Sequence, residues 1–144
     1  MKATVKLVDG MMFVAESGTG HAVVIDGPED LGGRNMGFRP MELMLMSVGA
    51  CSSVDVVNIL RRGRQQISGC EARLEAERAD AVPAVFTKIH VQFVVKGKEL
   101  DPAKVKRAVE LSAEKYCSAS IMLMKAGVVM THGFEIVADE PAAA

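Results

Sequence analysis

The segment from Pro40 to Arg62 is the feature that most limits how this chain can fold. Pro40 suits the first position of a helix, where a missing N–H costs nothing, and Gly63 is a natural helix stop. A helix of this length is about 33 Å long, close to the span of a compact domain of this size. Its first half is apolar on every face, through Leu43, Met44, Leu45, Met46, Val48 and Ala50. Such a helix is buried all round. One small domain can hardly wrap it alone, so we expect a homodimer with this helix in its interior.

Alternating apolar and polar residues predict strands on both sides of this helix. The predicted strands cover residues 3–8, 11–16, 21–26, 71–78, 86–95 and 128–137. Asp9-Gly10 predicts a tight hairpin between the first two. A second helix opens at Asp101 and ends at Cys117, and Gly127 stops a short third helix. The sequence therefore predicts an α+β fold with about six strands in antiparallel runs.

Length and composition indicate one domain. The chain has 144 residues, of which 49% are hydrophobic and 24% charged, so we expect a single domain over residues 1–144 with a disordered tail at 139–144. The longest uncharged apolar run, 43–54, ends at Asp55 and is shorter than the roughly 20 residues of a bilayer span. The N-terminus lacks the apolar core of an export signal. We expect a cytoplasmic protein without a membrane partner.

The charge balance argues against nucleic acid as a partner. Lys and Arg number 17 against 18 Asp and Glu, which gives a formal net charge of -1. Nucleic-acid-binding surfaces gather basic residues, and single-strand binders add stacking aromatics. Aromatic residues make up only 4% of this chain, and tryptophan is absent.

Any chemistry is expected in free thiols. The three cysteines are Cys51, Cys70 and Cys117. They form no C-x-x-C, and an odd number is a poor disulfide framework for a secreted protein. The three histidines are isolated in the sequence, so the pattern predicts no metal and no other cofactor.

A purely structural interpretation remains open for each thiol, because free cysteine is among the most buried residue types. Cys51 follows the small pair Gly49-Ala50, which lets another backbone or a ligand come close. Cys70 has no special neighbour and is interpreted as structural. The ten methionines include clusters that serve as core filler or line a soft apolar pocket for an alkyl chain.

Three short motifs on two predicted helices carry a family resemblance. The motifs read Pro40-Met41-Glu42-Leu43, Gly49-Ala50-Cys51-Ser52 and Ala113-Glu114-Lys115-Tyr116-Cys117-Ser118. Together they resemble the OsmC/Ohr superfamily, and most closely its YhfA-type branch, over nearly the whole chain. The resemblance implies an OsmC-like fold and an intertwined homodimer, in which sheets of both subunits wrap two central helices. It also implies thiol-dependent reduction of organic hydroperoxides.

The resemblance assigns roles to two cysteines. Cys51 corresponds to the peroxidatic thiolate, and Cys117 to the resolving thiol that converts a sulfenic acid to a disulfide. An external dithiol would then reduce the disulfide. Two alternatives stay open. The protein is a non-catalytic redox sensor or small hydrophobic ligand-binding dimer, or it is a structural dimer with inert cysteines.

The cation that would activate Cys51 is missing from its usual place. The peroxidase branches carry an arginine in the opening hairpin, whereas residues 8–16 contain none. Their glutamate directly follows the proline, whereas Met41 precedes Glu42 here. The glycine-rich loop 28–39 offers Arg34 and Arg39. We predict that Arg39 activates Cys51 and that Glu42 orients it; the alternative is that both arginines only solvate the loop.

Overall fold

The computed structural model describes residues 1–139, which form two compact units. Unit 1 is Met1–Met44, and the described part of unit 2 is 45–139. Of the predicted tail, 139–144, all but Asp139 lies outside the described residues.

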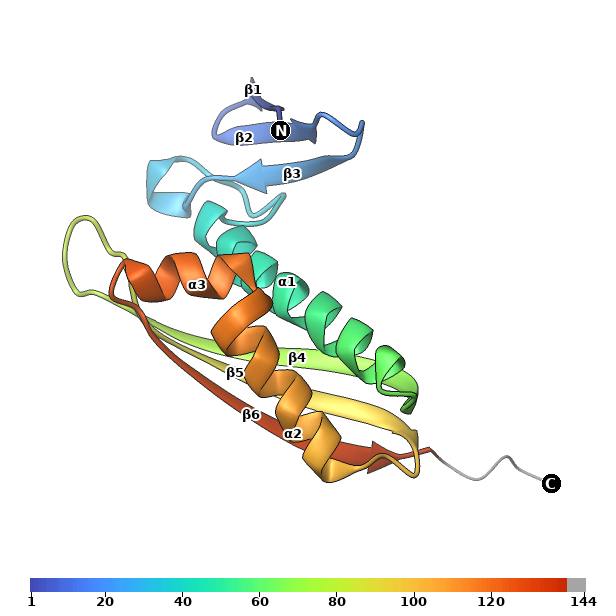
Figure 1. Ribbon diagram of the computed structural model, residues 1–144. Coiled ribbons are helices and arrows are strands. Elements are labelled where there is room, and N and C mark those ends of the chain that lie inside the picture. Colours follow the sequence, from blue (N-terminus) through green and yellow to red (C-terminus); the bar gives the residue numbers. More distant parts are fainter. Residues whose placement is uncertain (140–144) are drawn as a thin grey trace. The chain divides into compact units, whose positions relative to one another are not determined.

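Unit 1 is built on a three-stranded antiparallel sheet in the order β1-β2-β3 (Figure 1). Its strands are β1 (Ala3–Asp9), β2 (Met12–Ser17) and β3 (Ala22–Asp26). Gly10 has a φ of 54° in the predicted hairpin, a conformation that glycine adopts at no steric cost. Every residue of β1 is exposed within the single chain, including Val5 at 60% and Leu7 at 61%.

Helix α1 (Pro40–Arg62) has the predicted bounds and ends at Gly63, whose N–H donates to the Ile59 carbonyl at 2.8 Å. Its buried residues are Val48, Gly49, Ser52, Val56 and Leu60. Val54 is 69% exposed, so the single chain does not bury the helix on all sides. By length and hydropathy α1 could cross a membrane, and 28% of its most apolar window is buried. The core helix of a soluble protein passes the same test.

Unit 2 contains the second sheet, in the order β4-β5-β6 (Figure 1). Its strands are β4 (Gln66–Arg78), β5 (Phe86–Lys98) and β6 (Val129–Ala138). β4 and β5 pair antiparallel, as predicted, but β5 and β6 pair parallel. The prediction of antiparallel runs throughout was therefore wrong for β6. The helices between β5 and β6 carry the chain back along the sheet, which is the crossover that a parallel pair needs.

That crossover consists of α2 (Pro102–Leu111), a π-helical turn (Ser112–Tyr116) and α3 (Ser118–Lys125). The Asp101 side chain caps α2 by accepting a hydrogen bond from Ala103 N at 2.9 Å, as its position before a proline predicts. At Cys117 the backbone is extended (φ -69°, ψ 100°), so the chain changes direction there before α3 begins. The helical run of α2 and the π-helical turn therefore ends at Tyr116, and the predicted end of the second helix at Cys117 is confirmed.

The core of unit 2 lies between its sheet and its helices, and α1 and α2 cross the same face of the sheet (Figure 1). Four inward residues of β5 are 0% exposed: Ile89, Val91, Phe93 and Val95. Gly49 lets α1 approach β4 closely, because a Cβ at this position would lie 2.6 Å from Leu74 Cδ1. The small residue before Cys51 therefore serves helix–sheet packing, and this packing fixes where the cysteine lies.

Candidate thiol site

Unit 2 brings Cys51 and Cys117 together. Cys51 lies in the middle of α1 and is partly exposed, whereas Cys117 lies between the π-helical turn and α3 and is 0% exposed. The two sulfur atoms lie within 4.8 Å of each other, and the Cys51 thiol donates a hydrogen bond to Cys117 Sγ. Two sulfurs at this separation, one of them open to solvent, have the geometry of a redox pair.

The sulfur of Cys117 is surrounded by hydrogen-bond donors. Ser52 Oγ lies 3.2 Å from it, and Ser120 Oγ lies 3.1 Å from it. The backbone N–H of Ser120 donates to the same sulfur at 3.4 Å. Ser52 and Ser120 are both 0% exposed. Buried hydroxyls aimed at one sulfur stabilise a thiolate there.

Backbone N–H groups at the N-terminus of α3 donate hydrogen bonds to both thiols. Ser120 N–H donates to Cys117 Sγ, and Ala119 N–H donates to Cys51 Sγ. A helix N-terminus carries partial positive charge and lowers thiol pKa values. The π-helical turn produces this arrangement. Its closing hydrogen bond, from Cys117 N to Ser112 O at 2.9 Å, ends the helical run at the point where the cysteine faces α1. π-Helical turns are frequent at functional sites.

The two pKa values move in opposite directions. Burial raises the pKa of Cys51, and the neighbouring Cys117 and Asp55 raise it further against the opposing Ala119 N–H. Burial also raises the pKa of Cys117, but the hydrogen bonds from Ser120, Ser52 and Cys51 outweigh it, so the pKa of Cys117 is lowered. The pair therefore holds its negative charge first on Cys117.

Asp55 adds a carboxylate to the two thiols of the site. It lies one turn after Cys51 on α1, and one of its carboxylate oxygens lies within 4.8 Å of both sulfurs. Ser112 Oγ donates to Asp55 Oδ2 at 3.4 Å and lies 3.2 Å from the Ser52 carbonyl. Burial raises the pKa of Asp55, and the Ser112 hydrogen bond partly opposes that rise.

Cys70 stands outside this cluster. It lies on β4, where Ser53 hydrogen-bonds to its thiol. Burial raises the pKa of Cys70 despite that bond. The structural role of Cys70 stays a prediction from the sequence.

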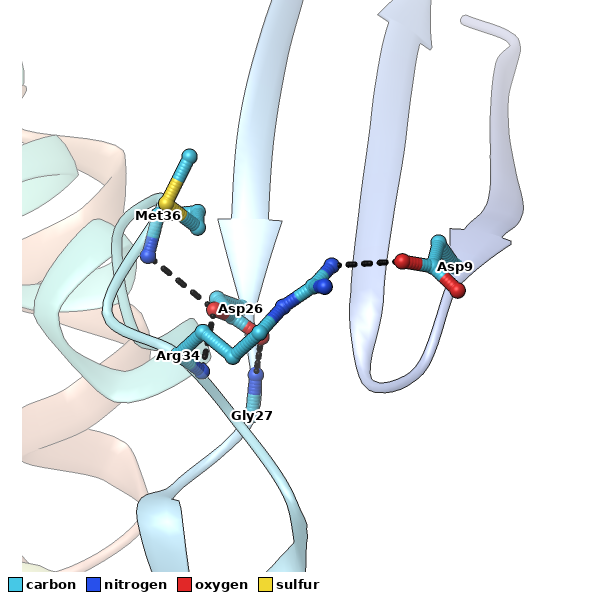
Figure 2. Close-up of polar contacts among 5 residues, drawn as sticks. All are labelled: Asp9, Asp26, Gly27, Arg34 and Met36. Carbon is cyan, nitrogen blue, oxygen red and sulfur yellow. Dashed lines mark hydrogen bonds and ion pairs between the residues drawn. The ribbon is translucent and has the colours of Figure 1, made fainter.

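In unit 1, Asp26 organises the glycine-rich loop (Figure 2). Its side chain is 1% exposed and accepts hydrogen bonds from the N–H groups of Gly27 at 2.9 Å, Arg34 at 2.8 Å and Met36 at 3.0 Å. The hydrogen bond from the Met36 N–H contributes most to lowering the pKa of Asp26, and the one from the Arg34 N–H comes next. The loop is thus folded around one buried carboxylate. The hydrogen bond from the Arg34 N–H to that carboxylate fixes the backbone position of Arg34.

The two candidate arginines have different surroundings. Arg34 Nη2 makes an ion pair with Asp9 Oδ2 at 2.7 Å, with both side chains mostly exposed (Figure 2). Arg39 Nη1 is buried and has no hydrogen-bond partner among the described residues. Glu42 Oε2 accepts from the backbone N–H of Arg39 at 2.9 Å, as in a helix-capping interaction. Glu42 therefore caps α1. Among the described residues it makes no ion pair with the Arg39 guanidinium, contrary to the orienting role expected from the sequence.

The sequence assigned no role to four side chains that contact the thiols or Asp55 or, in the case of Asp55, lie beside the thiols: Ser52, Asp55, Ser112 and Ser120. Two local signals point to them. Ser52 follows Cys51 directly. Ser120 is three residues after Cys117, at the position whose N–H commonly donates to the side chain of a helix N-cap. Their convergence depends on the π-helical turn, which no periodicity in the sequence predicts.

A separate cavity of about 490 Å³ lies in unit 2 between α2, α3 and β6. Its apolar lining is Val109, Ala113, Met124, Met130 and Phe134. His132 also lines it, and the Nε2 atom of that ring is buried without a hydrogen-bond partner among the described residues. Burial is the main cause that lowers the pKa of His132, so the ring is neutral at pH 7.

Comparison with known proteins places this geometry in a family. The family described as "OsmC-like protein" matches residues 32–133. The chain belongs to the OsmC-like family. It is 48% identical over 141 residues to Protein YhfA of Escherichia coli K12, covering 96% of this chain and 99% of that protein.

Solved structures share the OsmC-like fold. A hypothetical protein from Aquifex aeolicus superposes with a TM-score of 0.84 at 27% identity, over 96% of this chain and 97% of that one. The organic hydroperoxide resistance protein OhrB of Bacillus subtilis superposes with a TM-score of 0.60 at 22% identity, over 94% and 98% of the two chains. At that identity the Bacillus protein supports the fold alone. The predicted family, its YhfA-type branch and the α+β fold are confirmed.

Proposed function

We propose that this OsmC-like protein reduces organic hydroperoxides with Cys51 as the attacking thiol and Cys117 as the resolving thiol. The observation that carries the proposal is the hydrogen-bonded sulfur pair, of which one sulfur is partly exposed and the other 0% exposed. A peroxide reaches only the exposed sulfur, so Cys51 attacks although the charge rests first on Cys117. The reaction class itself follows from the OsmC/Ohr resemblance of the sequence, and the OsmC-like family match supports that resemblance.

The hydrogen bond between the thiols provides the first proton transfer. The Cys117 thiolate takes the proton of the Cys51 thiol, and the Cys51 thiolate then attacks the outer oxygen of ROOH. The O–O bond breaks, Cys51 becomes a sulfenic acid, and the departing RO⁻ leaves as ROH with the proton from Cys117. Cys117 is then a thiolate again, held by Ser52 and Ser120.

The second step closes the disulfide. The Cys117 thiolate attacks the sulfenic sulfur of Cys51 and expels hydroxide, which leaves as water. The sum is two thiols and ROOH giving one disulfide, ROH and water. An external dithiol restores both thiols by exchange, which suits the reducing cytoplasm, where we place the protein.

Hydroperoxide consumption tests the proposal. With dithiothreitol as the dithiol, the wild type should consume cumene hydroperoxide catalytically, and Cys51→Ser should lose that activity by more than a hundredfold. Cys117→Ser should form a sulfenic acid on Cys51 that dimedone traps. Cys70→Ser is the matched control and should behave as the wild type. Equal consumption by the wild type and Cys51→Ser would refute the proposal.

We also propose that a second copy of this chain completes the protein, with α1 at the interface. Within one chain Val54 of α1 is 69% exposed, and Val5 and Leu7 of β1 are 60% and 61% exposed. Apolar surface of this kind is typically covered by a partner. Sedimentation equilibrium should give a dimer, and a folded monomer at micromolar concentration would contradict it.

The alternative function, binding of a small hydrophobic ligand, has its own observation. The cavity of about 490 Å³ has an apolar lining that includes Met124. His132 also lines it, and its Nε2 has no hydrogen-bond partner among the described residues. That volume lies within the range of small-molecule sites. A ligand with an apolar body and one hydrogen-bonding group fits it. Met130→Trp on β6 should fill the cavity and abolish binding of such a probe, measured by calorimetry, and should leave hydroperoxide reduction intact.

A further inference from the structure

Asp55 is the ionisable group at the thiol site to which the proposed reaction gives no role. Its carboxylate, Cys51 Sγ and Cys117 Sγ all lie within 4.8 Å of one another. Cys51 and Asp55 are one helical turn apart on α1, so they share a face, and Cys117 meets them from the start of α3. Two sulfurs and one carboxylate oxygen therefore converge on one point.

The set has the composition of a thiophilic metal site. Zn²⁺ binds cysteine sulfur at about 2.3 Å and carboxylate oxygen at about 2.0–2.2 Å in tetrahedral geometry. Those bond lengths place two sulfur ligands about 3.8 Å apart. The observed limit of 4.8 Å therefore requires only small side-chain rotations to close around an ion.

Each of these groups has a supporting hydrogen bond of the kind found around metal ligands. Ser112 Oγ donates to Asp55 Oδ2 at 3.4 Å, which holds the carboxylate. Ser120 Oγ lies 3.1 Å from Cys117 Sγ, and the Ala119 N–H serves Cys51. Such outer partners orient ligands and keep thiolates anionic.

Charge points the same way. The groups that act electrostatically on Cys51 are Cys117 and Asp55, both acidic. Two thiolates and a carboxylate would carry three negative charges in a half-buried cluster, which is costly without a cation. A divalent ion neutralises two of them. Cys51 and Asp55 are not fully buried, so the ion has an entry path and an open fourth position.

We propose that the reduced protein binds one thiophilic divalent cation of the Zn²⁺ and Cd²⁺ type through Cys51, Asp55 and Cys117. Binding converts two thiols and a carboxylate to an M(SR)₂(OOCR)⁻ complex and releases two protons, with water in the fourth position. The metal bonds occupy both sulfurs, so a bound ion excludes the reaction proposed above. Metal binding itself does not depend on that reaction.

Titration of the reduced protein with Cd²⁺ tests the site, through the ultraviolet thiolate-to-cadmium charge-transfer band. The wild type should bind one equivalent per chain, and Cys51→Ser or Cys117→Ser should lose about half of the band. Asp55→Asn should keep the band but bind at least about tenfold more weakly. Glu114→Gln, at an exposed acid of the π-helical turn, and Cys70→Ser should match the wild type, with circular dichroism verifying each fold.

Two results would overturn the metal site: no band at one equivalent, or Asp55→Asn binding as tightly as the wild type. The assay contains no peroxide, so it separates this inference from the proposed function. A wild type that consumes cumene hydroperoxide but does not bind Cd²⁺ refutes only the metal site. One that binds Cd²⁺ without consuming peroxide refutes only the peroxidase.

Discussion

Ser52 Oγ lies 3.2 Å from Cys117 Sγ, although 65 positions separate the two residues in the chain. The same hydroxyl lies 2.8 Å from the Val48 carbonyl one turn earlier on α1. Its single proton therefore has two acceptors, and a thiolate at Cys117 attracts it more strongly than a neutral thiol does. Ser52 thus links the middle of α1 to the charge state of the buried thiol.

We predict that Ser52→Ala and Ser120→Ala each raise the pKa of Cys117, because each removes a donor to the thiolate. The measurement is the ultraviolet absorbance of thiolate against pH in a Cys70→Ser background. Ser53→Ala is the matched control, since Ser53 serves only Cys70 among the thiols. An unchanged titration in both variants would contradict this account of Cys117.

The same substitutions carry a stability signature. A lowered pKa of Cys117 in the folded state stabilises the reduced protein increasingly as pH rises from the folded pKa to the unfolded one. That contribution is lost as pH falls through the folded pKa. The difference in urea unfolding free energy between the wild type and Ser52→Ala should therefore widen with rising pH. A difference that is constant with pH would show that Ser52 only packs.

We predict that a slight excess of hydroperoxide produces one disulfide, between Cys51 and Cys117, and leaves Cys70 free. The first two sulfurs lie within 4.8 Å, whereas Cys70 lies apart on β4 with Ser53. Peptide mapping after alkylation identifies the linked pair. A disulfide that includes Cys70, or three free thiols, would count against the two-cysteine reaction.

The sequence predicted α1 with its bounds because a proline and a glycine punctuate it and each acts locally. It also predicted the hairpin at Asp9-Gly10 and the strand that begins at Phe86 for similarly local reasons. The parallel pairing of β5 with β6 escaped it, because strand direction depends on where the α2–α3 crossover leaves the chain.

The site divides in the same way. Cys51 and Cys117 could be chosen from the family resemblance, but their relative pKa values could not, because the donors come from α3 and from the serine beside Cys51. Arg39 and Glu42 are three residues apart, and spacing alone suggested an ion pair. The Glu42 carboxylate instead accepts a hydrogen bond from the backbone N–H of Arg39, because the start of a helix leaves that donor unsatisfied.

Arg39 and Arg34 give a direct comparison of the candidate activating cations. The hypothesis from the sequence, that Arg39 activates Cys51, predicts that Arg39→Met slows Cys51 alkylation at pH 7. Arg34→Met should have little effect, since Arg34 already pairs with Asp9 at 2.7 Å. Iodoacetamide rates against pH provide the measurement. If neither arginine matters, the N-terminus of α3 is the activating group.

Gly49 offers a test of how the site is positioned. An added methyl at Gly49 would lie 2.6 Å from Leu74 Cδ1, so Gly49→Ala should push α1 away from β4 or displace that side chain. Overpacking of this kind costs about 1–3 kcal/mol, against which the better helix propensity of alanine returns about 1 kcal/mol. The net loss of unfolding free energy should be about 1 kcal/mol.

A second substitution separates this steric effect from others. Leu74→Val shortens the side chain that meets the new methyl, so Gly49→Ala should cost less in that background than in the wild type. If the shift of α1 is what matters, Gly49→Ala also slows disulfide formation between Cys51 and Cys117, and the double variant restores it. Urea unfolding and peroxide-driven thiol loss measure the two effects. Strictly additive costs would show that Leu74 does not limit the approach of α1 to the sheet.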